Sequence, residues 1–178
     1  ELFYRNGWTD GLPVVLPTRR RVEAMIAACK RDPQESLGVV PPQGGAATIE
    51  KLAINAVMGG CLPEHFPVVI AAMQAMMEPA HNLNGVLQTT HMCVSLVIVN
   101  GPLARRLGFN SRDGVFGNGY RAYAAVGRGV RPALWNLGGA FPWDTDKSTL
   151  SHPGEYAFCI AEEEEDNPWP PLHVERGC

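Results

Sequence analysis

The sequence has no long apolar run and no excess of basic residues. Its most apolar window, residues 66–77, is shorter than the roughly 18 residues that cross a membrane, and Glu78 and Pro79 follow it. The 15 Lys and Arg are outnumbered by 18 Asp and Glu, for a formal net charge of −3. Because phosphate binding needs clustered, uncompensated cations, we expect neither a membrane nor a nucleic acid as a partner.

The cysteines are too few and too widely spaced for a disulfide-rich scaffold or a paired-cysteine metal site. The five cysteines are an odd number, and no two of them form a Cys-x-x-Cys pair. The chain opens without the charged and apolar regions of a signal peptide. We therefore expect reduced thiols and a cytoplasmic location.

The common cofactor and metal motifs are also missing. The sequence contains no His-Glu-x-x-His, no paired Cys/His spacing, no Walker loop and no Gly-x-Gly-x-x-Gly after a predicted strand. Residue spacing alone therefore assigns no cofactor and no metal.

The length and the apolar content are the first positive signals. A chain of 178 residues fits one hydrophobic core, so we expect a single domain over residues 1–178. Hydrophobic residues make up 46% and charged residues 19%, which is more apolar than an ordinary soluble domain. This balance predicts a homo- or hetero-oligomer that buries part of the surface.

Periodicity predicts a mixture of helices and strands. Helices are expected at residues 18–30, 48–59, 66–77 and 120–137, and strands at 37–40, 86–89, 94–99 and 156–161. Gly127, Gly129 and Pro132 are expected to bend or loosen the last helix. The order lacks strict β-α-β alternation, so the expected fold is α/β or α+β, with a mixed sheet packed with helices.

A glycine-rich loop, residues 116–121, precedes the last predicted helix. Glycines there let backbone N–H groups approach an anion at the positive end of the helix, and Arg121 adds charge. Asn118 and Arg121 are therefore candidate substrate anchors. The alternative is that Asn118 is an ordinary helix N-cap.

Thr90 and His91 follow a predicted strand, where loop residues are well placed to touch a ligand. His91 could act as a general base or as a metal ligand. A histidine with a purely structural role is the alternative.

The predicted strand at 156–161 places Cys159 between two alanines on its small face. Such a thiol either faces a substrate or packs under a helix. The following residues, Glu162 to Glu165, alternate in direction, so at most two share one side. They form either a solvated edge or a site in which repulsion raises the pKa of one acid.

Several segments together resemble an uncharacterised bacterial family associated with UGSC-type thiol or selenocysteine proteins. They are WTDGLPVVLPT, ATIEKLAINAVMGGC, TTH, IVNGP, GNGYRA, WNLGGAFP and HPGEYAFCIAEEEEDNPWPPLHVERG. The UGSC proteins are distantly similar to the selenoprotein B component of glycine and betaine reductases. The resemblance implies redox or carbon–heteroatom bond-cleaving chemistry on a small anionic substrate, shared with a thiol or selenol partner protein. Family members continue beyond the ERG segment, so a fragment or one subunit of a larger assembly is expected.

The resemblance supports roles for residues along the whole chain. His91 is the expected acid or base, and Cys159 the expected thiol or ligand, in one shared pocket. Glu162 and Glu164 are the expected catalytic carboxylates, and the expected substrate-binding residues are Thr90, Asn118 and Arg121. Three functions stay open: an oxidoreductase or lyase subunit, a non-catalytic assembly subunit, and a metal-dependent hydratase or lyase.

Overall fold

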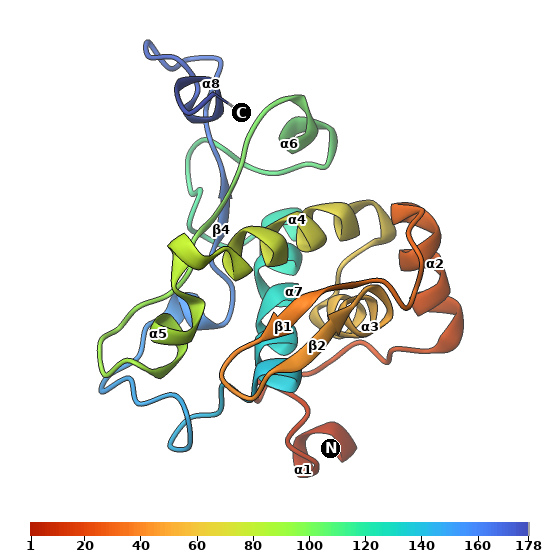
Figure 1. The fold of residues 1–178 in the computed structure, drawn as a ribbon. Coiled ribbons are helices and arrows are strands. Elements are labelled where there is room, and N and C mark those ends of the chain that lie inside the picture. The colour runs from red at the N-terminus through yellow and green to blue at the C-terminus, as the bar shows by residue number, and fades with distance from the viewer. Residues whose placement is uncertain (178) are drawn as a thin grey trace.

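Eight α-helices and two two-stranded sheets make up residues 1–177, the part of the chain that the computed structural model describes (Figure 1). The helices are α1 (Leu2–Arg5), α2 (Arg19–Cys29), α3 (Ile49–Gly59), α4 (Phe66–Met77), α5 (Leu83–Gln88), α6 (Pro102–Arg106), α7 (Arg121–Gly138) and α8 (Leu172–Glu175). The strands are β1 (Ser36–Val40), β2 (Gly45–Thr48), β3 (Val97–Val99) and β4 (Cys159–Ala161). The fold is α+β, and two small separate sheets take the place of the single mixed sheet that was expected.

The helix α7 lies at the centre of the molecule and contacts α3, α4, β1, β2 and β4 (Figure 1). It continues without a break from Arg121 to Gly138, with Pro132 inside it, so neither the proline nor the glycines interrupt the helix. Its glycines serve close packing instead: a Cβ built on Gly59 would lie 2.6 Å from Cα of Gly129. Only glycine permits that approach between α3 and α7.

Local signals located the longer helices well. The side chain of Thr48 caps α3 by accepting a hydrogen bond from the backbone N–H of Lys51 at 3.3 Å, and Gly60 ends the helix at φ 91°. The bounds of α4 are the predicted ones, with Pro67 in the first turn where a missing N–H costs nothing. Its residues Phe66, Val69 and Met73 are fully buried, as an all-apolar helix predicts.

The short apolar runs were assigned less well. The predicted strand at 86–89 is wrong, because most of it belongs to α5, whose N-cap Asn82 accepts a hydrogen bond from Gly85 N–H at 3.4 Å. The predicted strands at 94–99 and 156–161 shorten to β3 and β4, and Pro153–Glu155 forms a 3₁₀ turn, η3. Periodicity cannot separate helix from strand in runs this short.

The strands β3 and β4 are parallel, with Val97 opposite Cys159 and Val99 opposite Ala161. Their carboxyl ends therefore meet at one edge, where Asn100 and Gly101 leave β3 and the glutamates leave β4. Ligands of parallel sheets characteristically bind at this edge. None of the helices within residues 1–177 combines the length and the apolarity needed to cross a membrane.

Candidate functional site

Three metal-ligating side chains converge at the carboxyl ends of β3 and β4. One ligand atom from each of Glu162, Glu164 and His173 can be chosen so that all three lie within 4.8 Å of one another. The two carboxylates come directly after β4, and His173 belongs to the short helix α8. The sequence predicted both carboxylates but not the histidine, because the proline-rich segment that carries it has no periodic pattern.

The four consecutive glutamates divide by alternation along an extended chain. Glu162 and Glu164 face the cluster, whereas Glu163 accepts hydrogen bonds or ion pairs from Ser111 Oγ at 2.7 Å and Arg112 Nε at 3.0 Å. The hydrogen bond from Ser111 and the charge of Arg112 hold the pKa of Glu163 below its usual value. Glu165 pairs with Arg105 and Arg112. Glu162 and Glu164 therefore have no arginine partner among residues 1–177.

Hydrogen-bond donors fix the orientation of both cluster carboxylates. Asn100 Nδ2 donates to Oε2 of Glu162, and the backbone N–H of Leu172 donates to both of its oxygens at 3.0 and 3.1 Å. The backbone N–H of Gly101 donates to Oε1 of Glu164 at 3.0 Å. An ionised carboxylate offers about four acceptor sites, so each glutamate keeps lone pairs for a further partner.

The imidazole of His173 completes the cluster in an unusual way. Its Nδ1 lies 3.1 Å from Oε1 of Glu164, yet this atom is shielded from solvent and makes no hydrogen bond with any described residue. The proximity is therefore an ion-pair distance without hydrogen-bond alignment. The side chain as a whole is one-third exposed, and a shielded nitrogen of this kind calls for a partner such as a water molecule or an ion.

A groove adjoins the carboxylates. Its volume is about 480 Å³, and Arg105, Arg112, Tyr120 and the glutamates line it. This size falls in the range that accommodates a small molecule. The arginines are exposed and could also contact an anionic group.

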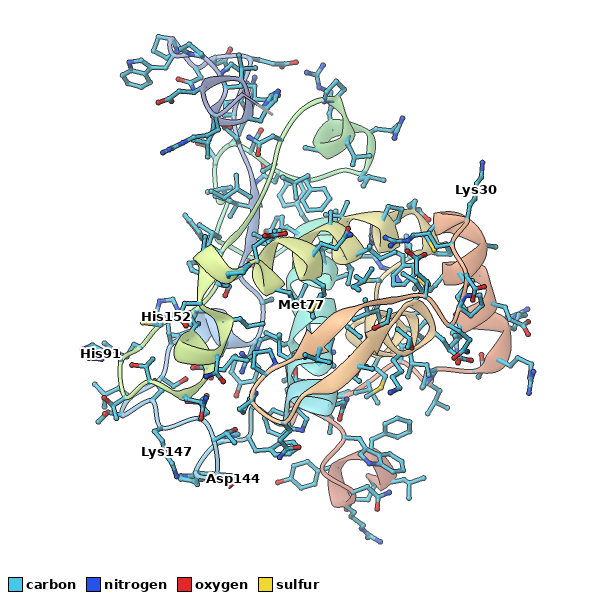
Figure 2. The ribbon with its side chains drawn as sticks, in the orientation of Figure 1. Lys30, Met77, His91, Asp144, Lys147 and His152 are labelled. Atoms are coloured by element: carbon cyan, nitrogen blue, oxygen red, sulfur yellow. The ribbon has the colours of Figure 1, made fainter. Side chains whose placement is uncertain are left out.

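His91 lies elsewhere, on the loop after α5 at the edge of the molecule (Figure 2). It is exposed, and its Nδ1 is 3.2 Å from Oγ1 of Thr89. The expected position at a strand end is wrong because the preceding segment is helical. Thr90 contributes its carbonyl oxygen, which accepts from the backbone N–H and the hydroxyl of Thr149, both at 3.1 Å.

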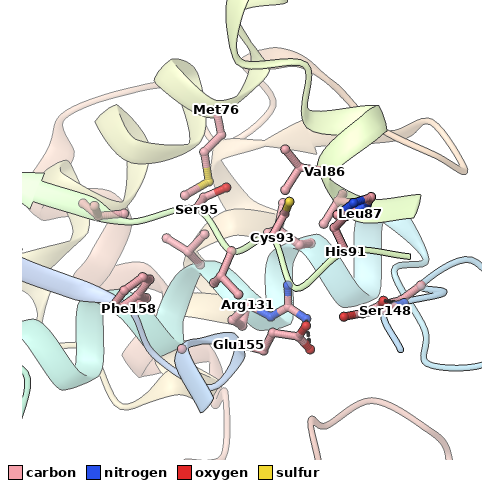
Figure 3. A pocket seen from close by; sticks show the side chains of 17 residues that line it. Met76, Val86, Leu87, His91, Cys93, Ser95, Arg131, Ser148, Glu155 and Phe158 are labelled. Carbon is pink, nitrogen blue, oxygen red and sulfur yellow. Dashed lines mark hydrogen bonds and ion pairs between the residues drawn. The ribbon is translucent and has the colours of Figure 1, made fainter. Parts of the chain in front are cut away.

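Figure 3 shows the cavity that His91 lines together with Cys93, Arg131 and Glu155. Arg131 Nη2 lies 3.7 Å from Glu155 Oε2, and burial lowers the pKa of this arginine against the opposing effect of the nearby carboxylates. The cavity volume is about 20 Å³, which holds about one water molecule. The cavity beside His91, Arg131 and Glu155 is therefore too small for a substrate of several atoms.

Cys159 is buried, with 4% of its surface exposed. Burial, with a smaller effect from Cys61, raises the pKa of its thiol to about 12. Its strand packs against α7, where a Cβ on Gly127 would lie 2.8 Å from the backbone nitrogen of Phe158. The face that looked open in the sequence is thus covered by a helix.

The remaining predicted residues do not gather around His91 either. Cys159 and Asn118 line a separate groove of about 780 Å³ beside His152. Arg121 donates to the carbonyl oxygen of Gly60 at 3.3 Å, and Tyr120, not Asn118, occupies the N-cap position of α7. The expected pocket shared by His91 and Cys159 is not among the cavities that these two residues line.

The predicted site residues therefore do not form one site, and among them the two carboxylates alone belong to a described cluster of potential metal ligands. No protein-family model, curated protein or solved structure matches the chain. The chemistry of the cluster is thus the basis on which a function is argued.

Proposed function

We propose that this chain is a subunit of a bacterial enzyme complex and acts as a metal-dependent hydratase or lyase on a small anionic substrate. Glu162, Glu164 and His173 hold the metal ion. The observation that carries the proposal is the convergence of their ligand atoms within 4.8 Å beside a groove of about 480 Å³.

The ligand set indicates the class of metal. Two carboxylates and one imidazole suit Zn²⁺, Mn²⁺ or Fe²⁺, whereas soft ions prefer thiolates and Mg²⁺ prefers oxygen ligands with several waters. Two carboxylate charges also balance the charge of a divalent cation. Three protein ligands leave coordination positions open, which is typical of catalytic rather than structural sites.

Each residue has a distinct part in the proposed reaction. A bound divalent ion would supply Lewis acidity towards an oxygen of the substrate. Asn100 and the N–H groups of Gly101 and Leu172 hold the carboxylates in a ligating orientation, as outer-shell partners do in metal sites. Arg105 and Arg112, on the wall of the groove, balance the charges of Glu163 and Glu165, so an anionic substrate would be attracted chiefly by the bound ion.

The redox alternative is less well supported by the geometry. A thiol with a pKa of about 12 stays protonated at neutral pH, so Cys159 would be a poor nucleophile or ligand. Thiol or selenol chemistry would therefore depend on the partner protein. Cytoplasmic location remains part of the proposal and accords with the free thiols of Cys29, Cys61, Cys93 and Cys159.

Calorimetric titration with Zn²⁺ and Mn²⁺ tests the proposal. We expect one ion per wild-type chain, and loss of binding in Glu164→Gln and His173→Ala. Asn100→Ala should weaken binding by about 10- to 100-fold, because it only orients a ligand. The matched control is Glu175→Gln, which changes an exposed carboxylate in α8 outside the cluster and should bind as the wild type does.

Absence of binding to the wild-type chain would contradict the proposal. Equal affinity of the wild type, Glu164→Gln and His173→Ala would contradict it too, since the ion would then lie elsewhere.

A further inference from the structure

The last described part of the chain, residues 167–177, is attached to the molecule without contributing to its hydrophobic core. None of these residues is buried, and none belongs to the hydrophobic core, which ends at Ala161. Figure 1 shows α8 at the tip of the molecule, away from α3 and α7. We call residues 167–177 the C-terminal segment.

Its polar contacts with the rest of the described chain run through the two glutamates of the cluster. The backbone N–H of Leu172 donates to Glu162, and His173 approaches Glu164 at 3.1 Å. The other hydrogen bonds of the segment are internal, such as that from Trp169 N–H to Oδ1 of Asn167 at 3.1 Å. The same two carboxylates thus hold both the segment and, in the proposed function, the metal ion.

An ion pair holds the residue that directly precedes the C-terminal segment. Asp166, directly before the segment, pairs with Arg112 Nη2 at 2.9 Å, and Arg112 also pairs with Glu163. This ion pair thus directly precedes the segment, and the residues beyond Asp166 contribute nothing to the hydrophobic core.

We propose that the C-terminal segment is a lid that the metal ion locks over the site. This inference rests on the proposed metal site. With the segment closed, the ion has three protein ligands; with the segment open, it loses His173 and retains only two carboxylates. The closed form must therefore bind the ion more tightly, and by linkage the ion must favour closure.

Closure has a consequence for function. The segment supplies the ligand His173 and the Leu172 N–H that orients Glu162, so its opening weakens the site. Metal loading and lid closure are then one coupled event, and occupancy of the site is regulated by whatever competes for the segment.

Hydrogen–deuterium exchange read by mass spectrometry tests the lid on the whole chain. With Zn²⁺ at ten times its dissociation constant, exchange in peptides covering 167–177 should slow by up to about tenfold relative to protein in EDTA. Peptides from α3 and α7 should exchange equally in both conditions, which also checks the fold of each variant. Glu175→Gln should match the wild type, and His173→Ala should show no slowing.

Each outcome decides one statement. Slowing in the wild type that disappears in His173→Ala supports the lid. Zn²⁺ binding at the three ligands without slower exchange overturns the lid and leaves the metal site intact. Slowing that persists in His173→Ala overturns both, because the ion would then act on the segment without His173. Absence of Zn²⁺ binding in the wild type overturns both the metal site and the lid.

Discussion

At the scale of single residues, the segment WTDGLP has a structural explanation that requires no catalytic role. In the segment WTDGLP, Asp10 accepts two hydrogen bonds from Arg128 of α7, at 3.2 and 3.0 Å, and only 8% of its side chain is exposed. Thr9 donates to the carbonyl oxygen of Leu12 at 2.7 Å. These contacts tie the N-terminal segment to the central helix, so the motif has a structural role.

Replacing Asp10 by Asn should destabilise the fold by about 3 kcal/mol at pH 7, because it leaves a largely buried guanidinium without its countercharge. Burial raises the pKa of Asp10, but the hydrogen bond and charge of Arg128 outweigh it and leave the pKa lowered. The stabilising contribution is therefore present above the unfolded pKa of about 3.9 and is lost as pH falls through the lower folded value. Urea denaturation measures it, with exposed Asp144→Asn as the control; equal effects of the two substitutions would contradict the account.

The cysteines should differ sharply in reactivity. Burial raises the pKa of Cys159 from 9.0 to about 12, so its thiolate fraction at neutral pH is about a thousandfold smaller. Exposed Cys93 should therefore be alkylated by iodoacetamide well before Cys159 and Cys61. Mass spectrometry of native protein checks the order, and early modification of Cys159 would restore it as a candidate nucleophile.

At the scale of elements, the packing of α3 on α7 depends on paired glycines. Gly59→Ala should gain helix propensity of about 1 kcal/mol but lose more, because its Cβ would lie 2.6 Å from Cα of Gly129. We expect a net destabilisation of about 1–3 kcal/mol in urea denaturation. A stabilised variant would show that the two helices can separate without cost.

The helices and strands also show which parts of the structure could be predicted from the sequence. Capping residues and long periodic stretches predicted α3, α4 and α7, and alternation put Glu162 and Glu164 on a common side. The short strands β3 and β4 depend on pairing between distant segments, which local pattern does not contain. His173 reaches Glu164 through the same long-range packing, so no local signal could have identified it as a ligand.

At the scale of the whole molecule, an apolar groove between α4 and β3 is not filled by any other part of the described chain. The groove has a volume of about 440 Å³ and is lined by residues such as Ala71, Ala75 and Ile98. We predict an oligomer at micromolar concentration, as the high apolar content also suggests. Light scattering measures this directly, and a single species near 19.3 kDa would contradict the prediction.

The central claim is that Glu162, Glu164 and His173 hold a divalent metal ion. The most direct test is anomalous diffraction from crystals of the chain grown or soaked with Zn²⁺. The account predicts a peak about 2.0–2.2 Å from one oxygen of each glutamate and one ring nitrogen of the histidine. Zinc bound elsewhere with these three side chains bare, or no anomalous peak at all, would contradict it.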